Sequence, residues 1–231
     1  LAQVCLARNE LARAHQLLQA FEQPGCPVCR LVAESVHAYI GSLVYEYANE
    51  PATHFAVRDA RGFCAAHAWH ALDQINASAL GIALLYEGLV RNLLKDMGEI
   101  TPDSGRRQVA AAAETLKPRA RCPVCAHRAI VEGHLLRGLL DHPDQSAFAE
   151  GFGASAGLCL PHLRQALESR AATPAKAQLL ALQQAIWRRL QGELAEFIRK
   201  SDYQFANEGL GSEADSPRRA VASLSGAKDL G

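Results

Sequence analysis

The chain of 231 residues carries 24 Lys and Arg against 24 Asp and Glu, so its formal net charge at neutral pH is zero. This balance gives no indication of binding to nucleic acid or to an anionic membrane surface. Hydrophobic residues make up 49% of the chain and aromatic residues only 6%, a composition that favours Ala- and Leu-rich packed helices over sheets.

The chain shows no pattern typical of a membrane span or a secretory leader. Its longest apolar run, residues 77–90, is short and contains Glu87, which indicates a buried helix rather than a transmembrane one. The cysteines are odd in number and mostly paired as Cys-x2-Cys. We therefore expect metal binding in a reducing cytoplasm rather than disulfides.

Helical periodicity begins near the start of the chain. Apolar residues at helical spacing predict a helix over residues 2–21. Cys5 lies near its apolar stripe, where a lone cysteine is most often a small buried hydrophobe, so we leave it out of the metal ligands. Pro24 and Gly25 end this helix.

The first half continues with further helices. One is predicted over residues 28–47, and a short helical connection leads from it to Gly62. Cys64 and His67 stand three residues apart at the start of the next helix, so both side chains lie on one face. An amphipathic helix over residues 82–93 closes this half.

The second half follows a loop at residues 101–105 and an Ala-rich helical piece within 106–121 that Pro118 ends. Thr173 and Pro174 supply the N-cap and first position of the last long helix. Beyond residue 200 the chain has no counterpart in the first half. We expect this arm either to pack across the helices or to bind another protein.

Two motifs occur twice in the chain: Cys-x2-Cys at the start of a helix and, further on, Cys-x2-His. Apolar positions repeat with them, since residues 39–44 match 135–140 at an offset of 96 and the Cys-x2-His motifs match at an offset of 95. We infer an internal duplication with one Cys3His metal site in each half. The predicted ligands are Cys26, Cys29, Cys64 and His67 in the first set, and Cys122, Cys125, Cys159 and His162 in the second.

The predicted fold is therefore all-α, with two tandem helical repeats forming a bundle. The expected divisions are an N-terminal helix (1–24), a first repeat (25–100), a linker (101–120), a second repeat (121–200) and a C-terminal arm (201–231).

Zinc is the expected metal, as two ions, because Cys3His is one of its common structural ligand sets. Four protein ligands leave no open position for water or substrate, so we expect structural rather than hydrolytic sites. The main alternative is a pair of Cys3His-ligated iron–sulfur clusters acting in electron transfer or redox sensing.

Other patterns carry less weight. Cys-Pro-Val-Cys is similar to the CxxC of thiol oxidoreductases, but that motif needs a βαβ surround. Residues 153–157 match G-x-S-x-G without the strand that a hydrolase requires. His127 is an alternative ligand beside Cys125, although the repeat favours His162. No convincing acid–base pair is present.

The chain resembles an uncharacterised bacterial family, domain of unknown function 6062, over nearly its whole length. The resemblance supports the helical metal-binding architecture and supplies no activity. The residues that carry it are the Cys-Pro-Val-Cys helix start, Leu43–Tyr47, Gly62–Cys64 with His67, Glu196–Lys200, Tyr203, Phe205, Asp215–Ser216 and Arg219–Ala220.

We therefore expect a non-enzymatic cytoplasmic metalloprotein whose two zinc ions hold a helical scaffold for binding another macromolecule, most simply a protein. No nucleic acid or membrane partner is indicated. A ligand-binding or regulatory role in a cleft between the repeats is a weaker option.

Overall fold

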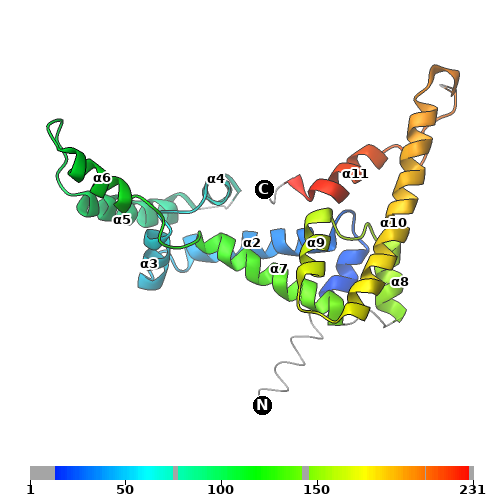
Figure 1. Cartoon of the computed structure of the whole chain (residues 1–231), viewed down its shortest axis with the longest axis horizontal. Helices are drawn as coiled ribbons and strands as arrows, with labels where there is room; N and C mark the ends of the chain where they lie inside the picture. Colours follow the sequence, from blue (N-terminus) through cyan, green and yellow to red (C-terminus); the bar gives the residue numbers. More distant parts are fainter. Residues whose placement is uncertain (1–13, 75–77, 142–145, 206, 229–231) are drawn as a thin grey trace, which may run out of the picture. The chain divides into compact units, whose positions relative to one another are not determined.

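The computed structural model describes residues 14–74, 78–141, 146–205 and 207–228. Within these ranges every regular element is a helix and none is a strand, so the predicted all-α class is confirmed (Figure 1). Cys5 and the part of the predicted 2–21 helix before residue 14 lie outside the described residues. Residues 14–21 are helical, and the helix ends ahead of Pro24 and Gly25 as expected.

Prolines stand in the first turn of many of the helices, where the missing N–H needs no partner and the fixed φ suits a helix start. The last long helix begins at Thr173, but its N-cap is Ala172 rather than Thr173 itself. The elements are α2 Pro27–Tyr45, α3 Pro51–Asp59, α4 Ala65–Gln74, α5 Ser78–Met97, α6 Arg106–Thr115, α7 Pro123–Asp141, α8 Ser146–Ala154, α9 Leu160–Glu168, α10 Thr173–Lys200, the 3-10 turn η1 Tyr203–Phe205 and α11 Ser216–Ser225.

Packing divides the chain into two compact units. The first unit combines Leu1–Ala33 with Val131–Gly231, and the second is Glu34–Ile130. The boundaries fall within α2 and α7. The units therefore differ from the repeats expected at 25–100 and 121–200, and those repeats remain a prediction about the sequence.

In the first unit, α10 packs against α8 and α11, and α11 also packs against α9. Three phenylalanine rings form part of the core, with Phe21 edge-on to Phe148 at 5.0 Å and to Phe152 at 5.6 Å between ring centroids. The C-terminal arm is thus part of this unit, which is the first of the two outcomes expected for it.

In the second unit, α5 packs against α3, α4 and α6. Its buried face includes Leu85 and Leu89, and Val57 is buried on α3. Among the described residues, no helix combines the length and the apolar character that crossing a membrane requires.

Candidate metal centres

The structure gathers all eight predicted ligands into two groups of four. In each group the candidate ligand atoms all lie within 4.8 Å of one another. Each group belongs to a single compact unit. The first-unit group is Cys26, Cys29, Cys159 and His162; the second-unit group is Cys64, His67, Cys122 and Cys125.

The predicted pairing within each half is wrong. The Cys-x2-Cys of the first half joins the Cys-x2-His of the second half, and the remaining two motifs join each other. The reason is topological, since the first unit is built from both ends of the chain and the second from its middle. Spacing within a motif is the same for either pairing, so only the tertiary fold decides between them.

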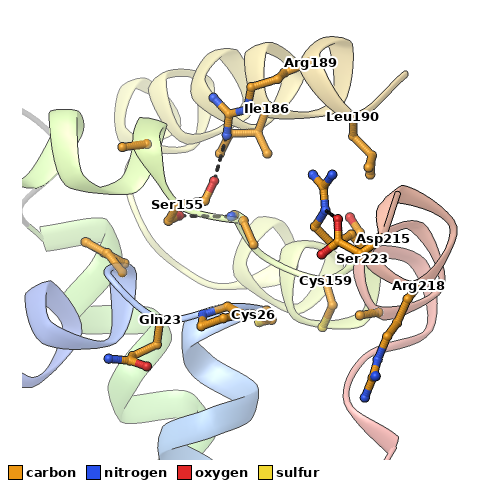
Figure 2. Close-up of a pocket in the computed structure, with 18 of the residues that line it drawn as sticks. Gln23, Cys26, Ser155, Cys159, Ile186, Arg189, Leu190, Asp215, Arg218 and Ser223 are labelled. Atoms are coloured by element: carbon orange, nitrogen blue, oxygen red, sulfur yellow. Dashed lines mark hydrogen bonds and ion pairs between the residues drawn. The ribbon is translucent and has the colours of Figure 1, made fainter. Parts of the chain in front are cut away.

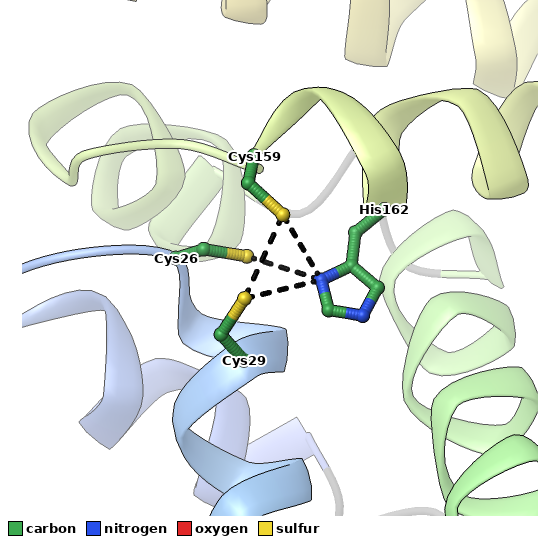
Figure 3. A group of neighbouring side chains, drawn as sticks. All are labelled: Cys26, Cys29, Cys159 and His162. Carbon is green, nitrogen blue, oxygen red and sulfur yellow. Dashed lines mark hydrogen bonds between the residues drawn. The ribbon is translucent and has the colours of Figure 1, made fainter. Parts of the chain in front are cut away.

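Helix starts position the ligands of the first-unit group (Figure 3). Cys26 directly precedes α2, and Cys29 lies in its first turn. Cys159 is the N-cap of α9, and His162 lies in the first turn of that helix. Two helix N-termini therefore meet at the group, where their positive dipole ends favour negatively charged sulfur.

The four side chains of this group are all buried. Nδ1 of His162 lies 3.2 Å from Cys159 Sγ, 3.4 Å from Cys29 Sγ and 3.6 Å from Cys26 Sγ. The sulfurs of Cys29 and Cys159 are 3.6 Å apart. Such a buried cluster of sulfurs around one imidazole nitrogen has the compactness that a tetrahedral metal site requires.

The sulfurs in the first unit share their protons unequally. Hydrogen bonds from Cys159 and Cys26 lower the pKa of Cys29, whereas burial raises the pKa of Cys26 well above its ordinary value. Burial lowers the pKa of His162, but hydrogen bonds to Cys159, Cys29 and Glu132 outweigh it and raise this pKa to about 11. Because thiolates and a neutral imidazole are the forms that bind metal, an ion must displace protons from this group to bind.

Glu132 also belongs to the first-unit site, although the sequence analysis did not identify it. Its Oε1 lies 3.5 Å from Nε2 of His162, on the side of the ring away from the sulfurs. A carboxylate on the outer nitrogen of a metal-ligating histidine fixes the ring orientation and raises its basicity. No spacing rule connects Glu132 to the ligands, so the sequence offers no signal for it.

A buried glutamine on α10 holds the segment that carries Cys159. Gln183 has no exposed surface, and its Oε1 accepts a hydrogen bond from Leu158 N–H at 2.9 Å. Its Nε2 donates to the Leu158 carbonyl at 3.2 Å. Gly157, just before, has φ +69, and a Cβ there would lie 2.7 Å from Gln183 Oε1. The glutamine side chain therefore supplies the hydrogen bonds that the buried backbone of Leu158 would otherwise lack.

The second-unit group has the same construction with more exposure. Cys64 and Cys122 directly precede α4 and α7, and His67 and Cys125 lie in the first turns of those helices. His67 Nδ1 lies 3.1 Å from Cys64 Sγ, 3.3 Å from Cys125 Sγ and 3.8 Å from Cys122 Sγ. The sulfurs of Cys64 and Cys125 are 3.6 Å apart. Cys64 and Cys125 are only half-buried, while His67 and Cys122 are buried.

One carbonyl fixes the loop before Cys122. The Asp59 carbonyl, at the end of α3, accepts hydrogen bonds from the backbone N–H of Arg119 at 2.7 Å and of Ala120 at 3.0 Å. The loop from Asp59 to Cys64 and the loop to Cys122 are therefore tied together, which brings the two motifs of this group to one place.

The cysteine pKa values of the second-unit group also shift in opposite directions. Burial, followed by the hydrogen bond to Cys64, raises the pKa of Cys125 to about 12. Burial also raises the pKa of Cys122, but hydrogen bonds from His67 and from the backbone of Cys64 and Cys125 outweigh it, and the net shift is downward.

His127, the alternative ligand, belongs to neither group. Its Nε2 lies 2.9 Å from Ser35 Oγ, and its ring stacks on Tyr39 with centroids 4.1 Å apart. Ser155 of the G-x-S-x-G match is buried; it donates to the Phe152 carbonyl and accepts from Gly157 N–H. The contacts of both side chains are therefore made outside the two ligand groups.

A cavity of about 750 Å³ opens in the first unit beside Cys26 and Cys159 (Figure 2). Apolar residues such as Phe21 and Ile186 line part of it, and charged residues line the rest. Arg189 is held by the carbonyls of Gly153 and Ser155 at 3.1 and 2.9 Å.

Fold and sites together define an all-α protein with two Cys3His groups at helix starts. The chain belongs to the family of unknown function DUF6062, whose model matches residues 16–230. It is similar to an uncharacterized 23.9 kDa protein in xynA 3'region from Caldicellulosiruptor sp. (strain Rt8B.4), with 26% identity over 195 residues, which cover 81% of this chain and 88% of that relative. No solved structure matches the chain.

Proposed function

We propose that the protein is a non-enzymatic cytoplasmic metalloprotein in which each compact unit holds one zinc ion in a structural Cys3His site. The observation that carries this proposal is the gathering of four ligand atoms within 4.8 Å, twice, at helix starts. Buried thiols and imidazoles seldom gather in this way unless something compensates for the loss of water.

The spacing of the ligand atoms favours a single ion over an iron–sulfur cluster. A tetrahedral ion with metal–sulfur distances of about 2.3 Å separates its sulfurs by about 3.8 Å. The S–S distances of 3.6 Å lie close to that value. The N–S distances of 3.1–3.8 Å lie on either side of the roughly 3.6 Å that a metal–nitrogen distance of about 2.0–2.1 Å gives. An iron–sulfur cluster places several irons and sulfides between its thiolates and needs a wider ligand cage.

A structural role follows from the number of ligands. Three sulfurs and one nitrogen complete a tetrahedron, so no position stays open for a water or a substrate. In each unit the ion would join the starts of two helices whose motifs lie far apart in the sequence. Its binding free energy would then contribute to the folding free energy of that unit.

The state of the cysteines supports a reducing compartment. None of the six cysteines among the described residues forms a disulfide. Thiols that must stay reduced to bind metal fit the cytoplasm, where disulfides are rare.

Two exposed apolar side chains on α5 support the binding of another protein. Val90 and Leu94 are 52% and 62% exposed, lie four residues apart on one side of the helix and adjoin the exposed ion pair of Glu87 and Arg91. Exposed apolar side chains rimmed by charged residues are typical of an interaction surface. A photo-crosslinking residue in place of Leu94 tests this role, since failure to capture any protein in cells would contradict it.

The metal content of the purified protein tests the central proposal. We expect close to two zinc ions per chain, no inorganic sulfide and no visible absorption, because zinc has no redox or d-electron transitions. Elemental analysis and an absorption spectrum measure these quantities. A coloured protein that bleaches on reduction, or a chain without bound metal after gentle purification, would refute the zinc assignment.

A further inference from the structure

The end of α11 reaches the sulfurs of the first-unit group. A Cβ built on Gly226, the residue after α11, would lie 3.8 Å from both Cys29 Sγ and Cys159 Sγ. The backbone of the next residue, Ala227, is close enough to the Cys29 thiol to lower its pKa. The C-terminal segment therefore lies beside two of the ligands that the metal proposal requires.

The conformation of Gly226 directs the chain to this position. Its φ and ψ are 88° and −177°, a region that is essentially restricted to glycine. Its own N–H still donates to the Ala222 carbonyl at 3.0 Å, which completes the last turn of α11. The chain then leaves the helix beside the sulfurs of Cys29 and Cys159.

The contacts of α11 fix the place of this turn. Trp187 on α10 donates its ring N–H to Ser223 Oγ at 2.9 Å. Arg219 donates to the Ser212 carbonyl at 3.0 Å and to Asp215 at 2.8 Å, and it also pairs with Glu193 on α10. These polar bonds, together with packing on α9, hold the helix against the unit that contains the group.

We infer that the turn at Gly226 and Ala227 is part of the first metal centre, where it covers the sulfurs and donates an N–H to the metal-bound Cys29. This inference rests on the proposed zinc function. N–H donors to a metal-bound thiolate stabilise its negative charge and keep solvent and competing chelators from the sulfur. The ion of the first unit should therefore leave slowly, whereas that of the second unit, with half-buried Cys64 and Cys125, should leave faster.

The experiment follows zinc release to a coloured chelator in chains that hold one ion. Cys64→Ser removes a ligand of the second group and leaves the first-unit ion to be observed alone. In this background we expect Gly226→Ala to accelerate release by about 10- to 100-fold, the usual range for outer-shell changes at metal sites. Ala227→Pro replaces the N–H donor with a ring carbon and should also accelerate release.

Two controls test whether faster zinc release comes from the turn at Gly226 and Ala227 or from a general loss of stability. Gly209→Ala, in the loop before α11 where a Cβ meets nothing within 4 Å, should leave the release rate unchanged. In a Cys159→Ser background, where only the second-unit ion remains, Gly226→Ala should have no effect.

The outcomes distinguish the inference from the proposal on which it rests. Equal release rates in the Gly226→Ala, Ala227→Pro and parent chains would overturn the role of the turn and leave the zinc function intact. A parent Cys64→Ser chain that binds no ion would instead overturn the zinc function.

Discussion

A Cys159→Ser chain is expected to bind one ion instead of two and to lose several kcal/mol of stability in its first unit alone. A serine hydroxyl is a poor replacement for a thiolate on zinc, and the free energy of binding is lost from folding. For small zinc-finger peptides this binding is worth about 10–16 kcal/mol, an upper limit for a unit that also has its own core.

The two tryptophans allow each unit to be followed separately. Trp187 lies on α10 in the first unit and Trp69 on α4 in the second. Urea unfolding followed by Trp187 fluorescence, in a Trp69→Phe background, should show a lower midpoint for Cys159→Ser. The matched variant Cys125→Ser, followed through Trp69 fluorescence, should lower the urea midpoint of the second unit. Equal destabilisation of both units by either change would contradict the assignment of one ion to each.

Gly157→Ala is expected to destabilise the first unit by about 2–5 kcal/mol. Part of this cost is conformational, because φ +69 is unfavourable for any residue with a Cβ. The rest is steric, since the new methyl would lie 2.7 Å from Gln183 Oε1 and 3.0 Å from Ile186 Cδ1. Moving Gln183 would also leave the buried polar groups of Leu158 without partners.

Gly98→Ala is the matched control for this prediction. Gly98 has φ +68, nearly the same as Gly157, but nothing lies within 4 Å of a Cβ at that position. We expect it to cost only the conformational part, about 1–2 kcal/mol, in the second unit. Urea unfolding of both variants measures the difference. Equal costs would show that the contact between Gly157 and Gln183 does not stabilise the fold.

Local patterns allowed much of this structure to be predicted. The helices of the described chain follow from apolar spacing and from prolines such as Pro27 and Pro123 at helix starts, which act within a few residues. The spacing of Cys64 and His67 places both side chains on one helix face for the same reason. The eight residues that gather into groups could therefore be found from the sequence.

Long-range relations could not be predicted in this way. Cys29 and His162 are 133 positions apart, and no local pattern says which of two identical motifs each Cys-x2-Cys meets. The same limit applies to Gln183, whose side chain bonds Leu158 from 25 positions away, and to Gly226 beside Cys159. The repeated motifs suggest two separate halves, but the ligand motifs of the two halves are exchanged between the units.

The zinc content of two double variants tests this exchange most directly. Cys29→Ser with Cys159→Ser removes two ligands of the same group, so we predict that one ion remains. Cys29→Ser with Cys64→Ser removes one ligand from each group, so we predict that no ion remains. The reverse result, with no ion in the first variant and one in the second, would show that each half binds its own ion and would contradict the account.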